Sequence, residues 1–217
     1  MADWLNTVFS GFDGAMFSFM HDLAVNAGGF FYPFFKFISF LGEGGWFAIV
    51  CGVIALLFKS TRKVGFAVLI GLFFGTIMNN SIIKNLVSRP RPYTANDTYF
   101  SWYEFVGASH TGKNSFPSGH SACTMAATIA WILTSKKKYR FLGLVFAILM
   151  GLSRVFLIVH YTTDVIAGLI VGAVAGTIAF LIVRFIYKKL EKYQDIEYCN
   201  FLINADISSF FRNYKDK

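Results

Sequence analysis

Residues 141–187 read FLGLVFAILMGLSRVFLIVHYTTDVIAGLIVGAVAGTIAFLIVRFIY, and this stretch decides the fold. It contains two apolar runs, 141–158 and 165–187, joined by a short polar turn that carries His160 and Asp164. A helix needs about 20 residues, each rising roughly 1.5 Å, to cross a hydrocarbon layer about 30 Å thick. Both runs are close to that length. The stretch therefore predicts two membrane-spanning helices, with the polar turn at one face of the membrane.

The composition of the whole chain is that of a membrane protein. Of its 217 residues 55% are hydrophobic, 18% are aromatic and only 15% are charged, and the mean hydropathy is +0.54. Four further runs with little or no charge cover residues 23–41, 45–58, 64–83 and 120–133, with a kink expected at Pro33. The sequence therefore predicts an all-α, integral membrane bundle of six transmembrane helices.

Clusters of Lys and Arg predict the orientation, because cations are retained on the cytoplasmic side. The clusters follow the second, fourth and sixth runs and consist of Lys59, Arg62, Lys63, Lys136, Lys137, Lys138, Arg140, Lys188, Lys189 and Lys192. We therefore expect a multi-pass plasma-membrane protein with both termini cytoplasmic and the long connection 87–116 outside. The net charge of +8 then reflects topology and lipid headgroups, and a nucleic-acid partner is not expected.

The first 20 residues have a pattern of their own. Apolar residues recur at helical spacing opposite polar ones; the apolar set is Trp4, Leu5, Val8, Phe9, Phe12, Met16, Phe19 and Met20, and the polar set is Asp3, Asn6, Thr7 and Asp13. This pattern predicts an amphipathic helix on the membrane surface, with an extra partial span as the alternative. The expected organisation is thus an interfacial helix at 1–20, a six-helix membrane domain at 21–190 and a cytoplasmic tail at 191–217.

Small residues repeat every four positions in two of the runs. The patterns are Gly71-xxx-Gly75 and Gly168-xxx-Gly172-xxx-Gly176. Such repeats let helix backbones approach closely. We expect packing inside the bundle rather than a dimer interface.

Three polar segments lie at the outer ends of the expected spans. Lys84 ends the third run and Arg91 follows it, residues 117–120 read PSGH at the start of the fourth, and Arg154, His160 and Asp164 surround the last outer turn. Ionisable residues at such positions are candidates for function. Cations and aligned amides suit phosphate oxygens, and a pair of imidazoles suits attack on phosphorus and protonation of the leaving oxygen. The set predicts a metal-free phosphoryl-transfer site.

These segments resemble the three-part signature of the type 2 phosphatidic acid phosphatase superfamily. That signature has the spacing K-x6-RP, then PSGH, then SR-x5-H-x3-D, and residues 84–92, 117–120 and 153–164 meet it in full. The resemblance covers about residues 60–187. It implies a helical core similar to that of the acid phosphatases and vanadium haloperoxidases, and an active site on the extracytoplasmic face.

The resemblance also implies a role for each residue. His160 would be the nucleophile that forms a phosphohistidine, Asp164 would set its tautomer, and His120 would be the general acid. The expected phosphate-binding residues are Lys84, Arg91, Ser118, Gly119 and Arg154. No metal and no cofactor is expected. Arg89 lies off the motif register, so we expect it to be a headgroup contact or a surface charge.

Taken singly, each residue has a simpler interpretation. His160 could be a polar residue at the membrane interface whose hydrogen bonds are satisfied by its neighbours. Asp164 could be a carboxylate in the first turn of the last span that stabilises the start of that helix. Lys84 and Arg91 could be cations that extend to the headgroups from span ends. The PSGH tetrapeptide alone is typical of a capped helix. Only the joint occurrence of the three segments favours catalysis.

The expected function is hydrolysis of a lipid phosphate or diphosphate at the outer face of the membrane. Phosphatidylglycerophosphate, phosphatidate and polyprenyl diphosphates are the substrates that the resemblance implies, so the expected partners are membrane lipids. Three rival functions stay open. They are a metallohydrolase that uses His120, His160 and Asp164 as ligands, a vanadate-dependent peroxidase, and a non-catalytic protein that binds or carries lipid headgroups.

Overall fold

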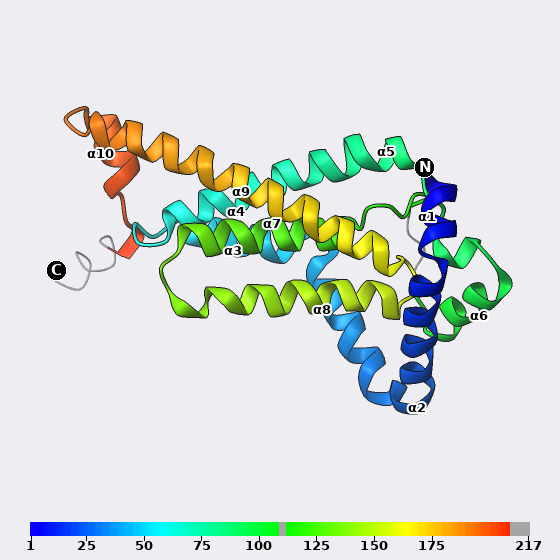
Figure 1. The fold of residues 1–217 in the computed structure, drawn as a ribbon. Coiled ribbons are helices and arrows are strands. Elements are labelled where there is room, and N and C mark those ends of the chain that lie inside the picture. The colour runs from blue at the N-terminus through cyan, green and yellow to red at the C-terminus, as the bar shows by residue number, and fades with distance from the viewer. Residues whose placement is uncertain (109–111, 209–217) are drawn as a thin grey trace.

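The protein is built from helices throughout the part that the structure describes. The structure is a computed structural model that describes residues 1–108 and 112–208, and 82% of the residues are helical, with no strand in these ranges. The expected all-α class is confirmed. The helices, shown in Figure 1, are α1 (Ala2–Val8), α2 (Ser10–Gly42), α3 (Trp46–Leu56), α4 (Arg62–Thr76), α5 (Lys84–Val87), α6 (Asp97–Phe105), α7 (Gly119–Thr134), α8 (Leu142–Phe156), α9 (Thr162–Lys192) and α10 (Glu197–Asn204).

Each of the six predicted spans falls on helix, and several of these helices are long and apolar enough to cross a membrane. The qualifying segments are Ser10–Leu56, Arg62–Val87, Lys138–Phe156 and Thr162–Lys192. They indicate a multi-pass membrane protein. Helices α3 and α7 are shorter, with 11 and 16 residues. The count of six spans therefore stays a prediction.

The centre of the bundle is the close contact of α9 with α7. A Cβ atom placed on Gly168, Gly172 or Gly176 would lie within 2.5 Å of a backbone carbonyl oxygen of α7 or of its N-cap residue. Only a residue without a side chain permits such an approach. Gly71 and Gly75 of α4 also face Ala126 of α7, less tightly, because an added Cβ would lie 3.1 Å from its carbonyl oxygen and 3.2 Å from its Cβ, respectively. The expected packing of the glycine repeats inside the bundle is confirmed.

Helix α2 bends sharply near its middle. The residue with non-helical backbone angles is Ala27, at φ −141° and ψ 23°, whereas Pro33 lies within regular helix, so the kink expected at Pro33 was placed wrongly. Two features favour a break at Ala27: the Asn26 side chain donates to the Asp22 carbonyl, and the two glycines that follow have low helix propensity. Figure 1 shows α1 and the first half of α2 crossing one end of the bundle.

The predicted N-terminal helix pattern agrees with the structure on most of its apolar side but not at Asp13. Trp4, Val8, Phe12 and Phe19 are each about half exposed or more, as a lipid-facing surface requires. The polar set divides, because Asp3 and Thr7 are exposed whereas Asp13 is only 2% exposed and packs against the rest of the protein. The location of this segment on the membrane surface stays a prediction.

The cation clusters gather at one end of the bundle. Lys63 lies 2.8 Å from Glu191 at the end of α9, and Arg62 donates to the carbonyls of Leu202 and Ile203 in α10. Figure 1 places the α3–α4 and α7–α8 connections at this end as well, and α5 and α6 at the opposite end. The polar segments of the sequence signature therefore lie far from the predicted cytoplasmic cations.

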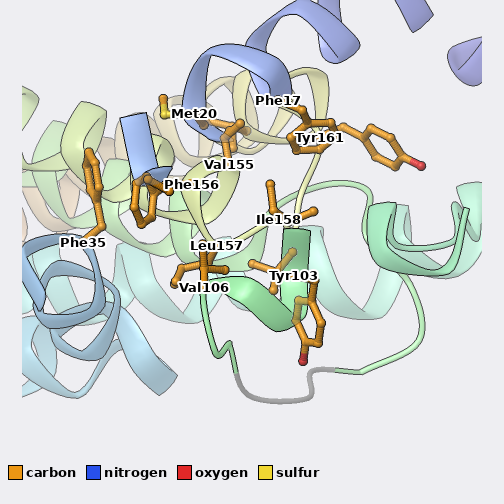
Figure 2. Close-up of a cluster of buried hydrophobic side chains, with 13 residues drawn as sticks. Phe17, Met20, Phe35, Tyr103, Val106, Val155, Phe156, Leu157, Ile158 and Tyr161 are labelled. Atoms are coloured by element: carbon orange, nitrogen blue, oxygen red, sulfur yellow. The ribbon is translucent and has the colours of Figure 1, made fainter. Parts of the chain in front are cut away.

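A hydrophobic cluster supports the turn between α8 and α9. Figure 2 shows Phe156, the last residue of α8, and Leu157 and Ile158 of the turn packed among side chains of α2 and α6. Ile158 is 1% exposed and has φ +54°, a conformation that is strained for a β-branched residue and persists only when the surroundings enforce it. The packing thus determines the path of the chain into His160.

Candidate active site

A single cavity collects most of the predicted site residues. It has a volume of about 310 Å³ and is lined, among others, by Lys84, Arg91, Gly119, His120, Arg154 and His160. The remaining two, Ser118 and Asp164, are fully buried directly behind its wall. Three segments that are far apart in sequence thus converge at one end of the bundle.

His160 presents its two ring nitrogens to opposite kinds of partner. Nε2 lies 3.1 Å from Nη1 of Arg91. Nδ1 lies 3.5 Å from Oδ2 of Asp164 and is buried without a hydrogen-bond partner among the described residues. Because a guanidinium offers only donors, Nε2 must accept, which leaves the ring proton on Nδ1. Burial, followed by the charges of Arg91, Arg154 and Lys84, holds the pKa of His160 well below its ordinary value of 6.5. The imidazole is therefore neutral at neutral pH, with its Nε2 lone pair at the cavity.

Lys84 and Arg91 reach the cavity because of the irregular chain around them. The segment Ile77–Ile83 between α4 and α5 is a π-helix, a form that is common at functional sites, and Lys84 follows it directly. Arg91 lies in the extended chain before Pro92 and donates to the carbonyls of Gly112, at 2.5 Å, and Val159, at 2.7 Å. These carbonyls hold its guanidinium beside His160.

The PSGH segment forms the N-terminus of α7. Ser118 is the N-cap, and its Oγ accepts from the Ser121 amide at 3.4 Å. Gly119 and His120 open the helix and line the cavity. The unpaired amides of a helix N-terminus favour an anion. The structure therefore places a positive helix end, a glycine and an imidazole on one wall.

Arg154 enters the cavity from the last turn of α8. Its side chain is 5% exposed, Nη1 donates to Ser39 Oγ of α2, and Nε is buried without a hydrogen-bond partner among the described residues. A buried donor of this kind is costly unless a ligand or water satisfies it. Arg154 also lines a neighbouring cavity of about 160 Å³ that contains Lys36 and Glu43.

Arg89 corrects an expectation from the sequence. It is neither a headgroup contact nor a surface charge, because its side chain is 1% exposed and forms ion pairs with Asp13, at 3.0 Å, and Asp164, at 2.8 Å. Its guanidinium also lies over the Tyr161 ring, 3.6 Å from the centroid. An arginine in a Pro-rich loop is usually exposed. Arg89 is buried because Asp13 and Asp164 pair with it, and the sequence alone did not identify these two carboxylates as its partners.

Two further polar residues near the site escaped the sequence analysis. Asn79 is fully buried and donates to the Pro117 carbonyl at 3.3 Å and to Asn80 Oδ1 at 3.0 Å, while Asn80 lines the cavity. A pair of amides inside an apolar run was the available signal, because polar groups within a span usually face the protein interior. Asp13 gave a weaker signal, since it fitted the polar side of a surface helix.

The described residues contain no group of three or more His, Cys, Asp and Glu side chains that could hold a metal ion. His120, His160 and Asp164 therefore do not form a ligand set of the kind that a metallohydrolase requires. Three cations line the same cavity and would oppose a divalent ion.

Comparison with known proteins gives named relatives. The chain is 32% identical over 119 residues to an undecaprenyl-diphosphatase of Sulfolobus acidocaldarius, with 54% of each protein covered. It is 31% identical over 144 residues to phosphatidylglycerophosphatase B of Bacillus subtilis, with 61% of this chain and 64% of the relative covered. The chain thus spans between about half and two thirds of the lengths of these relatives.

A solved structure shares the fold. The crystal structure of a transmembrane PAP2-type phosphatidylglycerolphosphate phosphatase from Bacillus subtilis matches with a TM-score of 0.61 at 22% identity, over 87% of this chain and 90% of that chain. The family profile itself matches residues 60–188, which include all three polar segments and more than half of the sequence. On that match, the protein belongs to the PAP2 superfamily.

Proposed function

We propose that this protein is a metal-independent phosphatase that hydrolyses a phosphate ester or anhydride bond of a membrane lipid. The observation that carries the proposal is the cavity in which two imidazoles and three cations meet. Its relatives are named as phosphatases for lipid phosphates and diphosphates, which supports the same class of reaction here.

In the first step, Nε2 of His160 attacks phosphorus and the bond from phosphorus to the lipid oxygen breaks. His120 donates a proton to the departing oxygen, and the product is a phosphohistidine with its remaining ring proton on Nδ1. Asp164 faces that proton from 3.5 Å. The negative charge of the bound substrate favours the protonated form of His120 between the surrounding cations.

In the second step, water attacks the phosphohistidine. His120, now neutral, takes a proton from the water as the new oxygen–phosphorus bond forms. The nitrogen–phosphorus bond breaks, its electron pair returns to Nε2, and inorganic phosphate leaves. The resting state of His160 is thereby restored.

Lys84, Arg91 and Arg154 stabilise the charge that gathers on the phosphoryl oxygens in both transition states. Arginine suits this task because its planar donors can contact two oxygens at once. Arg154 lines the cavity, and its Nε is without a hydrogen-bond partner among the described residues, which supports a contact with a phosphoryl oxygen once a headgroup is bound. Gly119 and His120, which open α7, line the same cavity.

The substrate we propose is phosphatidylglycerophosphate, phosphatidate or a polyprenyl diphosphate. A cavity at the end of an apolar bundle can receive a headgroup while the lipid tails stay in the membrane. The predicted orientation puts this cavity on the extracytoplasmic face, opposite the cation clusters. Helix α6, with Tyr99, Trp102 and Tyr103, has the aromatic content of an interfacial cover.

A phosphate-release panel tests the proposal. The purified protein in detergent is given each of the three lipids in the presence of a chelator, beside His160→Asn and Arg154→Gln. Phosphate release by the wild type and its loss in both variants, with unchanged helical content, is the expected result. Ordinary turnover by His160→Asn would overturn the mechanism, and strict dependence on added zinc would favour a metallohydrolase.

Two more readouts distinguish a phosphatase from a peroxidase and from a headgroup-binding protein. Halide oxidation with peroxide and vanadate would identify a peroxidase. Lipid binding without phosphate release from any of the three substrates would support a non-catalytic headgroup-binding protein.

A further inference from the structure

A buried charge network connects the N-terminal helix to the carboxylate behind His160. Its members are Asp13 of α2, Arg89 of the Pro-rich loop, and Thr163 and Asp164 at the start of α9. Asp13 is 2% exposed, Arg89 1% and Asp164 0%. Charges this deeply buried are costly unless they are paired and hydrogen-bonded, so each contact in the network has energetic weight.

Arg89 lies at the centre of this network and uses most of its donors. Nη1 donates to Asp164 Oδ1 and to Thr163 Oγ1, both at 2.8 Å, and Nη2 donates to Asp13 Oδ2 at 3.0 Å. Nε donates to Asn6 Oδ1 at 2.8 Å. The two carboxylates are thus held on one rigid guanidinium plane.

Asp13 also caps the helix that carries Asp164. Its Oδ1 accepts from the Thr163 backbone amide at 2.9 Å, and its Oδ2 accepts from the Thr163 hydroxyl at 2.8 Å. Capping by a carboxylate satisfies an amide at the start of α9 and is favoured by the helix dipole. This contact ties the α2 segment to the first turn of α9, one residue before Asp164.

The orientation of Asp164 follows from this arrangement. Arg89 donates to Oδ1, and the Tyr161 amide donates to Oδ2 at 3.0 Å, and this holds Oδ2 at 3.5 Å from Nδ1 of His160, which has no hydrogen-bond partner among the described residues. Arg89 alone would cancel the charge of Asp164. With Asp13 present, the three ionised groups carry a net charge of −1, which favours the ring proton on Nδ1 and the charge that develops on the imidazole.

We propose that Asp13 and Arg89 are positioning residues for the reaction, which hold the Asp164 carboxylate against the δ nitrogen of His160 and keep that carboxylate effectively negative. The proposal rests on the proposed role of His160 as nucleophile. It also gives the N-terminal segment, which lies outside the matched residues 60–188, a direct share in the catalytic geometry.

The first test is kinetic. Asp13→Asn keeps the shape of the side chain and removes its charge, and it should lower kcat by about 10- to 100-fold with KM changed by less than about threefold, because positioning rather than binding is lost. Asp164→Asn should lower kcat as well, and Asp13→Asn should add little in the Asp164→Asn background. Asp22→Asn, an exposed aspartate of the same helix, is the matched control and should equal the wild type.

The second test does not depend on turnover. In protein labelled with 15N-histidine, the Nδ1–H resonance of His160, assigned by its loss in His160→Asn, should lie downfield at neutral pH in the wild type and in Asp22→Asn. It should move upfield or broaden in Asp13→Asn and in Arg89→Gln, because the contact with Asp164 loosens. In Arg89→Lys, which keeps the positive charge but not the planar guanidinium, the resonance should lie between its positions in the wild type and in Arg89→Gln.

Two substitutions that keep all the charges test the proposal if a variant of Asp13 or Arg89 does not fold. Thr163→Val removes, at similar volume, the hydroxyl that joins Asp13 to Arg89. It should reduce kcat and shift the resonance more than Thr163→Ser, which retains the hydroxyl. Wild-type kcat and resonance in Asp13→Asn, or fully additive losses with Asp164→Asn, would overturn the positioning role. If the wild type releases no phosphate, the proposed function fails, and the resonance still decides whether the network holds His160.

Discussion

Nη1 of Arg91 lies 3.1 Å from Nε2 of His160, so the cation that we propose to bind phosphate contacts the lone pair of the proposed nucleophile in this structure. The same nitrogen of Arg91 donates to the Val159 carbonyl at 2.7 Å. Arrival of a phosphate group offers Arg91 stronger, charged acceptors and frees Nε2 to attack. In the proposed function, Arg91 is therefore both a phosphate ligand and a resting partner of His160.

Replacement of Arg91 by lysine should therefore be severe although the charge is kept. Lysine lacks the planar fork that contacts the carbonyls and the phosphoryl oxygens together, and we expect kcat to fall by about 10²- to 10³-fold. The rate of phosphate release from the lipid in detergent measures this fall in kcat. Arg184→Lys, an exposed substitution on α9, is the control and should behave as the wild type. Equal activity of the two variants would contradict the role of Arg91.

The two histidines should differ in their response to the leaving group. His120→Ala should lower turnover of a lipid phosphate by about 10²- to 10⁴-fold, because an alkoxide leaves poorly without a proton. With p-nitrophenyl phosphate the loss should be much smaller, since nitrophenolate needs little protonation. His160→Ala should lose both activities, because no phosphohistidine can form. For each variant, the loss of activity with the lipid phosphate is divided by the loss with p-nitrophenyl phosphate. If this ratio is the same for His120→Ala and His160→Ala, the two histidines do not have separate acid and nucleophile roles.

The pH dependence follows from the lowered pKa of His160. Burial and the cations Arg91, Arg154 and Lys84 disfavour its protonated form, while Asp164 and His120 are the other titratable groups that face it. The neutral nucleophile is present above the lowered pKa and is lost as the pH falls through it, so the acid limb of kcat/KM that belongs to His160 should lie well below pH 6.5. Removing a cation by Arg91→Gln should move this limb to higher pH.

The free energy of unfolding should change with pH in the same direction as the activity. Below the ordinary pKa of 6.5 the unfolded chain binds a proton at His160 more readily than the folded protein does, so the contribution of this group to folding decreases as the pH falls. A profile of kcat/KM from about pH 5 to about pH 9, with thermal unfolding at each pH, measures both effects. A His160-dependent limb above pH 6.5 would contradict the burial of a neutral imidazole.

The contact between α7 and α9 should be intolerant of a methyl group. A Cβ atom on Gly172 would overlap the Ala122 carbonyl oxygen, so Gly172→Ala must separate the helices and should lower the free energy of unfolding by about 1–3 kcal/mol. Gly29→Ala on α2 has open space at the same position and is the control. Thermal unfolding in detergent compares them. Equal stability of the two variants would show that α7 and α9 do not pack this closely.

The site was predictable where local pattern and motif carry the information. The apolar runs indicated helices at six places, and the shared position of Lys84, His120 and His160 at span ends indicated one site. Arg89 and Asp13 were not predictable in the same way. The hydrogen-bond partners of their side chains lie 74 or more positions away in the sequence. A charged residue on a surface-like helix pattern gives no sign that an opposite charge will be buried against it.

The sequence by itself determined the helical class, the apolar character of the bundle and the set of signature residues that line the cavity. These follow from periodicity, composition and short-range spacing, which act along the chain. Only the tertiary structure decided that α2 breaks at Ala27, that Asp13 caps α9, and that Arg89 joins Asp13 to Asp164. Those contacts form because charged groups that lose water when helices pack must be paired with an opposite charge. The free energy of such a pair depends on two residues that are distant in sequence, so no single segment predicts it.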